Sequence, residues 1–143
     1  MKKIKVWFRR KYLFWKYKHN NGTGKVIATK QEDRQLGLTT MMINDCLNRR
    51  CVLFVPNEMA KKRAYEEIYN MVNSPTFTSS INPNDYLLTL NDIKRGKLRG
   101  IRNVKIIIDN QCTYKDVVAL YDEGLGHNIE NGFIYCPFIT FII

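Results

Sequence analysis

The sequence predicts an α/β fold in three layers, with a mostly parallel sheet, preceded by a basic, aromatic N-terminal helix. Three observations lead to this prediction. Residues 3–18 contain no Gly or Pro and interleave aromatic with basic side chains. After residue 24, strand-like and helix-like stretches alternate, as in α/β proteins. Residues 51–56 and 104–109 are short, largely apolar runs that are typical of buried parallel strands.

The N-terminal segment predicts a helix whose apolar side chains recur at helical spacing. Its apolar side contains Ile4, Trp7, Phe8, Tyr12, Phe14 and Trp15. The Asn- and Gly-rich sequence at 19–24 then favours a turn. We therefore divide the chain into a basic aromatic arm, residues 1–22, and an α/β domain, residues 23–143.

The first half of the domain predicts a strand over 25–30, a helix over 39–50, a strand over 51–56 and a helix over 57–72. Asn57 can cap the last of these helices. Residues expected to face inward from the two helices are Met42, Ile43, Cys46, Leu47, Met59, Tyr65, Ile68 and Met71 or Val72.

The second half predicts a strand over 86–90, a short helix over 91–99, a strand over 104–109 and a helix over 113–123. In the last helix, the residues expected to face inward are Val117, Val118 and Tyr121. Residues 131–143 predict one or two further strands, broken by a proline.

The positive charge is concentrated at the N-terminus. The formal net charge is +10, and the first 25 residues carry nine basic and no acidic side chains, while the rest of the chain carries 14 basic and 13 acidic side chains. Such asymmetry indicates an anionic partner, either nucleic acid or an anionic membrane surface. The arm residues expected to contact nucleic acid or another partner are Trp7, Arg9, Arg10, Lys11, Trp15, Lys16 and Lys18.

Other interpretations of the arm remain open. Its aromatic side chains can instead pack on the domain while its charges are solvated. Adsorption to a membrane is not expected, because Lys11 and Lys18 interrupt the apolar side. A second basic cluster could extend the positive surface or be an ordinary solvated helix face. It contains Lys94, Arg95, Lys97 and Arg99.

Several classes of protein are not expected. The sequence has no apolar run of about 18 residues that could span a membrane, and its N-terminus does not have the pattern of a signal peptide. The four cysteines show no CxxC pair and no metal-ligand spacing with the two histidines. We therefore expect a cytoplasmic protein with reduced thiols and no structural metal.

One loop and one strand end suggest a family. The loop that follows the first predicted strand ends in Arg34-Gln35-Leu36-Gly37-Leu38-Thr39-Thr40, and a later apolar strand ends in Asp109. This order resembles the P-loop NTPase fold, especially the RecA-like domains of phage-type ATPases and terminase motors, over roughly residues 25–136. The resemblance implies nucleotide contacts from Arg34, Gly37, Thr39 and Thr40, and a magnesium-binding role for Asp109.

The chain departs from that family at the residues that carry catalysis. Leu38 occupies the position of the phosphate-binding lysine, Glu32 that of the first glycine, and Asn110 that of the water-activating glutamate. Removing one such group typically costs about 10²-fold in rate. We therefore expect no efficient hydrolysis unless Arg34, Lys30 or a partner supplies the missing cation. No cofactor is expected to be required, although bound ATP and Mg²⁺ stay possible.

These observations predict a non-hydrolysing, phage-type binding module that engages nucleic acid or a nucleoprotein machine, as a packaging accessory or as an inhibitor of a host nucleic-acid enzyme. Two alternatives stay open: an ATPase or nucleotide switch with an atypical loop, and a structural virion or assembly protein. Asp109 can also be a carboxylate that caps the following turn, and Thr39 and Thr40 can be ordinary helix-start residues.

Overall fold

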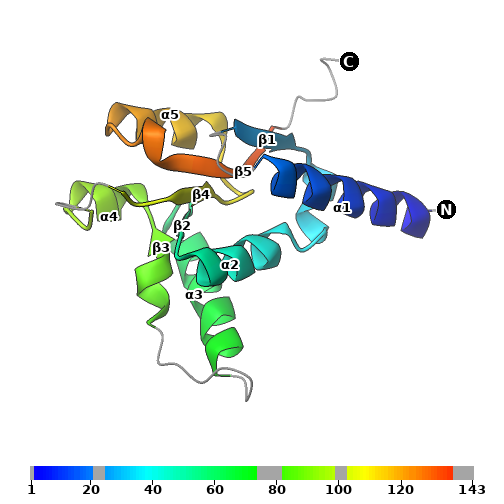
Figure 1. Cartoon of the computed structure of the whole chain (residues 1–143), viewed down its shortest axis with the longest axis horizontal. Coiled ribbons are helices and arrows are strands. Elements are labelled where there is room, and N and C mark those ends of the chain that lie inside the picture. Colours follow the sequence, from blue (N-terminus) through cyan, green and yellow to red (C-terminus); the bar gives the residue numbers. More distant parts are fainter. Residues whose placement is uncertain (1, 21–24, 74–81, 99–102, 137–143) are drawn as a thin grey trace.

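The computed structural model describes residues 2–20, 25–73, 82–98 and 103–136. In this part of the chain, five strands form an all-parallel sheet in the order β1-β5-β4-β2-β3 (Figure 1). The strands are β1 (Lys25–Thr29), β2 (Val52–Phe54), β3 (Leu87–Leu88), β4 (Ile106–Ile108) and β5 (Ile129–Tyr135). The α/β class and the parallel sheet are therefore confirmed.

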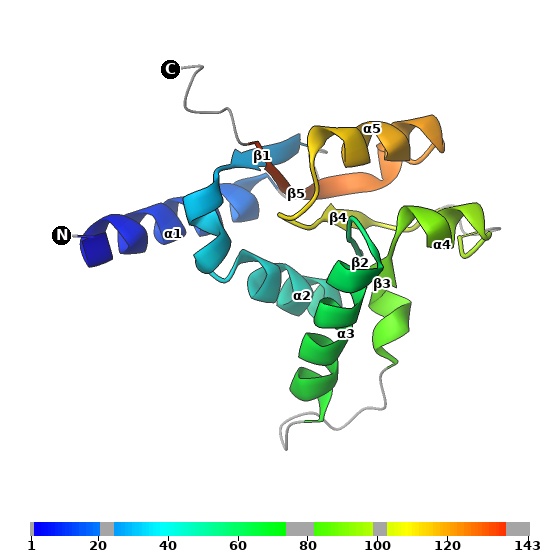
Figure 2. The same cartoon turned by 180° about the vertical axis from the view of Figure 1, so that it is seen from behind.

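Helices cover both faces of the sheet, so the domain has three layers (Figures 1 and 2). On one face lie α1 (Lys2–His19), α2 (Leu38–Arg49) and α3 (Glu58–Val72), and on the other lie α4 (Leu90–Lys94) and α5 (Tyr114–Asp122). Three short 3-10 helices join these elements: η1 (Gln31–Gln35), η2 (Pro83–Tyr86) and η3 (Gly126–Asn128).

The strands are buried on both faces, which explains their continuous apolar sequences. In β4, Ile107 packs among the side chains beneath α1, α2 and α3, whereas Ile106 and Ile108 pack beneath α4 and α5. All three are fully buried. The alternation follows from the two-residue period of a strand, so an apolar residue is needed at every position.

A glycine allows β4 and β5 to approach closely. Gly132 has φ +143°, and a Cβ at this position would lie 2.4 Å from the carbonyl oxygen of Ile108. The β4–β5 register also shifts between Ile106 and Ile107, so that Ile107 pairs with Asn131. The end of β4, where Asp109 follows, is thereby held against β5.

The bounds of α2, α3 and α5 lie within one residue of prediction, whereas α4 ends at Lys94 rather than at residue 99, and some facing residues differ. Asn57 caps α3 as expected, accepting a hydrogen bond from the Ala60 N–H at 2.8 Å. The inward prediction is wrong for the exposed side chains of Met59, Val118 and Tyr121. The buried side of α3 is formed by Ala60, Ala64, Ile68 and Val72, and that of α5 by Val117 and Leu120. Alanine is small enough to let a helix approach the sheet, so the two alanines face inward and the larger methionine faces solvent.

The C-terminal half of α1 packs on the hydrophobic core of the domain. Leu13 and Tyr17 are buried, the Tyr17 ring stacks on Phe133 at 5.5 Å, and the Tyr17 hydroxyl donates to Asp45 at 2.6 Å. Burial and the Asp45 hydrogen bond raise the pKa of Tyr17. The N-terminal half of α1 extends away from the sheet (Figures 1 and 2).

Candidate functional site

The fold brings the predicted loop and the predicted acid together at one edge of the sheet. Because all strands are parallel, their carboxyl ends share this edge, where ligands of open α/β sheets commonly bind. The Thr39 hydroxyl, in the first turn of α2, lies 2.8 Å from Asp109 Oδ1 and 2.8 Å from Asn110 Oδ1. Thr39 and Asp109 are 70 positions apart in the sequence, and the contact joins the start of α2 to the end of β4.

The start of α2 is shaped by a glycine and two threonines. Gly37 precedes the helix in a left-handed conformation, with φ 77°, and the space around its Cα is open. Thr40 donates a hydrogen bond to Glu67 of α3. Neither threonine is the N-cap of this helix, because that position belongs to Gly37. Thr39 therefore serves the contact with Asp109 rather than capping.

Asp109 is a buried carboxylate with one unpartnered oxygen. Its side chain is 0% exposed, and Oδ2 has no hydrogen-bond partner among the residues that the structure describes. Burial raises the pKa of Asp109 to about 6, although hydrogen bonds from Thr39 and from the backbone of Gln111 and Asn110 oppose the rise. The nearby Glu67 carboxylate adds to the increase. Asp109 thus interacts with its own turn and with α2.

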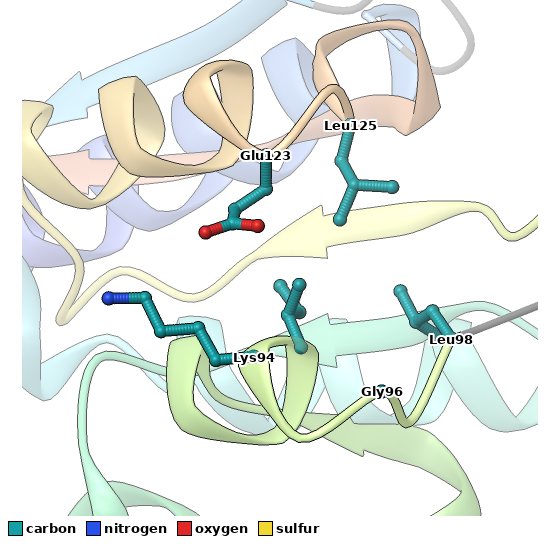
Figure 3. Close-up of a pocket in the computed structure, with 6 residues that line it drawn as sticks. Lys94, Gly96, Leu98, Glu123 and Leu125 are labelled. Atoms are coloured by element: carbon teal, nitrogen blue, oxygen red, sulfur yellow. The ribbon is translucent and has the colours of Figure 1, made fainter.

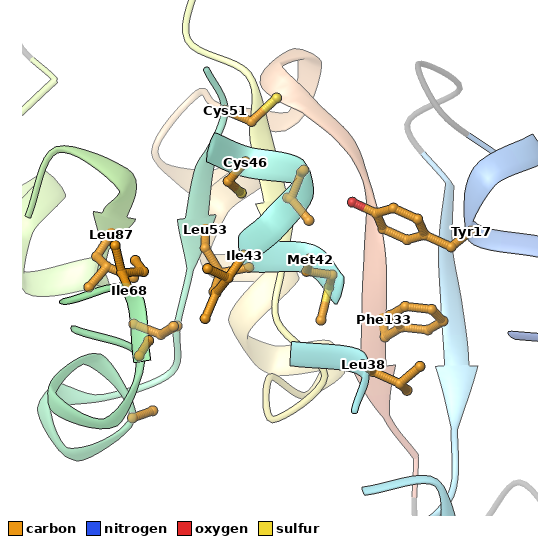
Figure 4. Close-up of a cluster of buried hydrophobic side chains, with 14 of the residues drawn as sticks. Tyr17, Leu38, Met42, Ile43, Cys46, Cys51, Leu53, Ile68, Leu87 and Phe133 are labelled. Atoms are coloured by element: carbon orange, nitrogen blue, oxygen red, sulfur yellow. The ribbon is translucent and has the colours of Figure 1, made fainter. Parts of the chain in front are cut away.

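Leu38, at the position of the family's lysine, belongs to the hydrophobic core. It is 1% exposed and lies in the cluster that contains Met42 and Phe133 (Figure 4). Burying an ammonium group in an apolar core without a partner is strongly unfavourable. A lysine introduced here would start from inside the core rather than above the loop, so restoring the family sequence does not restore a phosphate contact.

The loop after β1 encloses a carboxylate of its own. Asp33, in η1, is 1% exposed and accepts the backbone N–H of Lys30 at 3.0 Å. Arg9 of α1 donates two hydrogen bonds to it, each of 2.9 Å. The paired carboxylate also raises the pKa of Arg9. The segment that resembles a phosphate loop therefore already contains an anion and a matching cation.

Arg34, predicted as a nucleotide contact, interacts with the end of β5. Its guanidinium carbon lies 4.3 Å from the centre of the Tyr135 ring, a distance typical of a cation–π contact. Arg34 is exposed. It lies on the same loop as Gly37, but its described contact is to Tyr135 rather than to Thr39 or Asp109.

The bases of α1 are almost all without acidic partners. Within the described residues, Arg9 is the one base of this helix that forms an ion pair. The bases with no carboxylate partner in that part of the chain are Lys3, Lys5, Arg10, Lys11, Lys16 and Lys18. The helix therefore presents a concentrated positive charge to solvent.

The aromatic side chains of α1 are exposed as well. Trp7 is 53% exposed, Phe8 61%, Tyr12 46% and Trp15 58%. The interpretation in which these residues pack on the domain is therefore wrong for all four. The residues that do pack are Leu13, Phe14 and Tyr17.

The second basic cluster does not extend this surface. Lys94 and Arg95, at the end of α4, lie at the opposite end of the molecule from α1 in both views (Figures 1 and 2). The Lys97 amine donates to the carbonyl oxygens of Asn84 and Leu87, at 2.7 and 2.6 Å, and burial lowers its pKa. Arg99 lies outside the described residues.

A cavity near this second cluster lacks catalytic groups. It has a volume of about 260 Å³ and lies between α4 and the end of α5 (Figure 3). Its lining is mixed, with Ile93, Leu98 and Leu125 beside Lys94 and Glu123, which lie on opposite sides. It contains neither Thr39 nor Asp109, so it is separate from the sheet-edge site.

Comparisons of the chain with protein-family models, curated proteins and solved structures found no match. No helix among the described residues is both long and apolar enough to cross a membrane. The same residues contain no group of three or more His, Cys, Asp or Glu side chains arranged to hold a metal ion.

Three side-chain contacts in these sites were not predicted from the sequence. Glu67 contacts Thr40, Tyr135 contacts Arg34, and Arg9 pairs with Asp33 rather than remaining available to a ligand. All three contacts join residues that are distant in sequence. No spacing rule connects such positions, so only the tertiary structure could reveal them.

We predict that Asp109→Asn stabilises the protein at neutral pH. The pKa of Asp109 is higher in the folded state than in the unfolded state. The free energy of unfolding therefore falls as pH rises from about 4 to 6, and it is regained when Asp109 is protonated at lower pH. A rise from 3.8 to about 6 corresponds to about 3 kcal/mol at most. Urea unfolding at pH 7.5 should show the variant to be more stable, and at pH 4 the difference should largely disappear. An equal effect at both pH values would contradict this explanation.

Proposed function

We propose that this protein is a nucleic-acid-binding module, in which a non-hydrolysing P-loop-like domain carries α1 as its binding helix. One observation carries the proposal: α1 combines lysines and arginines that, Arg9 apart, have no carboxylate partner among the described residues with aromatic side chains that do not pack on the domain. This helix is fixed at its other end by Leu13 and Tyr17.

The charge distribution favours a polyanion as the partner. Lysine and arginine neutralise phosphates and release condensed counterions, which makes binding strong at low salt. Charged groups that are already paired contribute less, and among the described bases of α1 only Arg9 is paired. An anionic polymer can contact several of the remaining bases at once.

The sheet-edge site supports binding without hydrolysis. Hydrolysis in P-loop proteins depends on a lysine that neutralises phosphate charge and on a residue that orients or activates water. Here Leu38 is buried in the core, and Asn110, a neutral amide, lies beside Thr39. Asp33 adds a negative charge within the loop, although Arg9 neutralises it.

Nucleotide binding is the second candidate, and the contact between Thr39 and Asp109 favours it. In P-loop NTPases, the loop Ser or Thr and a strand-end Asp hold Mg²⁺ together. The hydroxyl and carboxylate here are within 2.8 Å, and Asp109 Oδ2 has no described partner, so the oxygen donors fit a hard cation. The chain would then act as a nucleotide-dependent switch.

The resemblance to phage-type ATPases suggests where such a module acts. A protein of this size that binds nucleic acid without hydrolysing nucleotide fits a packaging accessory or an inhibitor of a host nucleic-acid enzyme. A structural role in virion assembly would instead rest on the exposed aromatic residues of α1. Binding that persists at high salt would indicate that role, because burial of apolar surface is not screened.

We predict that Lys5→Ala/Arg10→Ala/Lys11→Ala weakens nucleic-acid binding and reduces its salt dependence. Each lost phosphate contact lowers the slope of log K against log salt by about one. Fluorescence anisotropy with a labelled oligonucleotide at several salt concentrations measures both quantities.

The matched control is Lys62→Ala/Lys94→Ala/Arg95→Ala, which removes three exposed bases from α3 and α4. This control should bind like the parent protein. Equal losses in the two variants would show that total charge, rather than α1, governs binding.

We also predict that the protein releases no phosphate from ATP or GTP in the presence of Mg²⁺. A coupled phosphate-release assay tests this, and turnover above background would contradict the non-hydrolysing role.

Thermal unfolding with and without Mg–ATP tests the second candidate function, nucleotide binding. Stabilisation that Thr39→Val abolishes would support a nucleotide switch, and no shift in either protein would leave α1 as the binding site.

A further inference from the structure

The outward side of α1 has a defined pattern. Ile4, Phe8 and Tyr12 are separated by four positions and Trp15 by three more, so they form one stripe along the helix. All four are between 46 and 61% exposed. Leu13 and Tyr17, which are buried, point the other way. We name this set, Ile4, Phe8, Tyr12 and Trp15, the outward stripe.

Positive charges accompany the stripe on both sides. Arg9 and Lys16 each lie 5.6 Å from the centre of the Tyr12 ring. On the helical projection, Lys11 and Lys18 flank one side of the stripe and Lys5 and Lys16 the other. The surface therefore alternates aromatic rings and cations, as groups that bind bases and phosphates do in single-strand-binding proteins.

Two of the rings are placed to accept bases. The Phe8 and Trp15 side chains are separated by about 10 Å along the helix axis, from a rise of about 1.5 Å per residue. The imidazole of His19 lies against the Trp15 indole at 4.2 Å and at an interplanar angle of 33°. His19 thus supports Trp15 while the indole is still more than half exposed.

We infer that the outward stripe binds single-stranded nucleic acid, with bases stacked on Phe8 and Trp15 and phosphates on the flanking lysines. This inference rests on the proposed function and specifies its ligand. In a duplex the base faces are already stacked, and only base edges are accessible in the grooves. Edges are recognised by hydrogen-bonding groups, whereas the stripe offers two, the Tyr12 hydroxyl and the Trp15 indole N–H. The unpaired nucleobases of a single strand instead expose the faces that aromatic rings contact.

The alternatives fit this surface less well. A second copy of the chain would bring two clusters of positively charged lysine and arginine side chains together, and their repulsion opposes such a contact. An anionic lipid surface favours an amphipathic helix with a broad apolar face. Trp7 widens the outward stripe only at Phe8, against which it packs edge-on at 4.9 Å, and cations lie on both sides of the stripe. A polymer with alternating phosphates and nucleobases matches this arrangement.

Both tryptophans of the chain lie in α1, so tryptophan fluorescence, excited selectively over that of the tyrosines, reports on this helix. In Trp7→Phe, Trp15 is the single indole. A single-stranded oligonucleotide of about twenty residues should quench Trp15 and bind more tightly than a blunt duplex of equal length. Polyglutamate, which carries negative charge but no nucleobases, should bind weakly and leave the tryptophan fluorescence unchanged.

The decisive variant is Phe8→Ala/Trp15→Ala, which retains every lysine and arginine of α1. It should lose at least about tenfold in single-strand affinity, measured by anisotropy, while the salt slope stays unchanged. Circular dichroism checks that α1 remains folded. The matched control, Tyr69→Ala/Tyr114→Ala, removes two exposed rings from α3 and α5 and should change affinity less than about twofold.

Each contrary result has a separate meaning. Equal affinity for duplex and single strand, with no loss in Phe8→Ala/Trp15→Ala, would overturn the single-strand inference but leave nucleic-acid binding intact. No binding of either nucleic acid, or equal binding of polyglutamate, would overturn the proposed function as well. A blue shift of Trp15 with phosphatidylglycerol vesicles, and no response to oligonucleotides, would assign the stripe to a lipid surface.

Discussion

The ion pair between Arg9 and Asp33 connects the two parts of this protein. It joins the middle of α1 to the loop after β1 by two hydrogen bonds of 2.9 Å, and the carboxylate is almost fully buried. Removing Arg9 would leave the buried Asp33 carboxylate without a compensating positive charge, which is costly. The pair fixes the rotation of α1 about its axis, because Arg9 must face the loop. Given that rotation, Leu13 and Tyr17 reach the core and the outward stripe faces solvent.

The same ion pair affects the sheet edge. A loop that binds phosphate offers its backbone N–H groups to an external anion. Here the Lys30 N–H is already donated to Asp33, and Leu38 faces the core. What remains of the resembling site is the contact between Thr39 and Asp109, at the far end of the loop. In the function proposed above, the α/β domain is the support and α1 carries the groups that bind the anionic ligand.

Much of the fold could be predicted from sequence, because apolar runs and helix caps act over short distances. The strand at β4 and the Asn57 cap are examples. The partners of charged residues could not be predicted. Arg9 resembles its basic neighbours in sequence, yet it alone among the described bases of α1 is paired, and Asp33 lies 24 positions away. Whether Phe8 and Trp15 are exposed or packed stays open in the sequence, because both arrangements fit aromatic residues at helical spacing and the orientation of α1 decides which side is covered.

Hydrogen–deuterium exchange with and without a single-stranded oligonucleotide tests the central claim most directly, because it locates the contact along the chain. The account predicts slower amide exchange in residues 3–15 of α1, which carry the outward stripe, and no change in α4 or at the start of α2. Slower exchange around Gly37 and Asp109, with α1 unchanged, would contradict the account and move the binding site to the edge of the sheet.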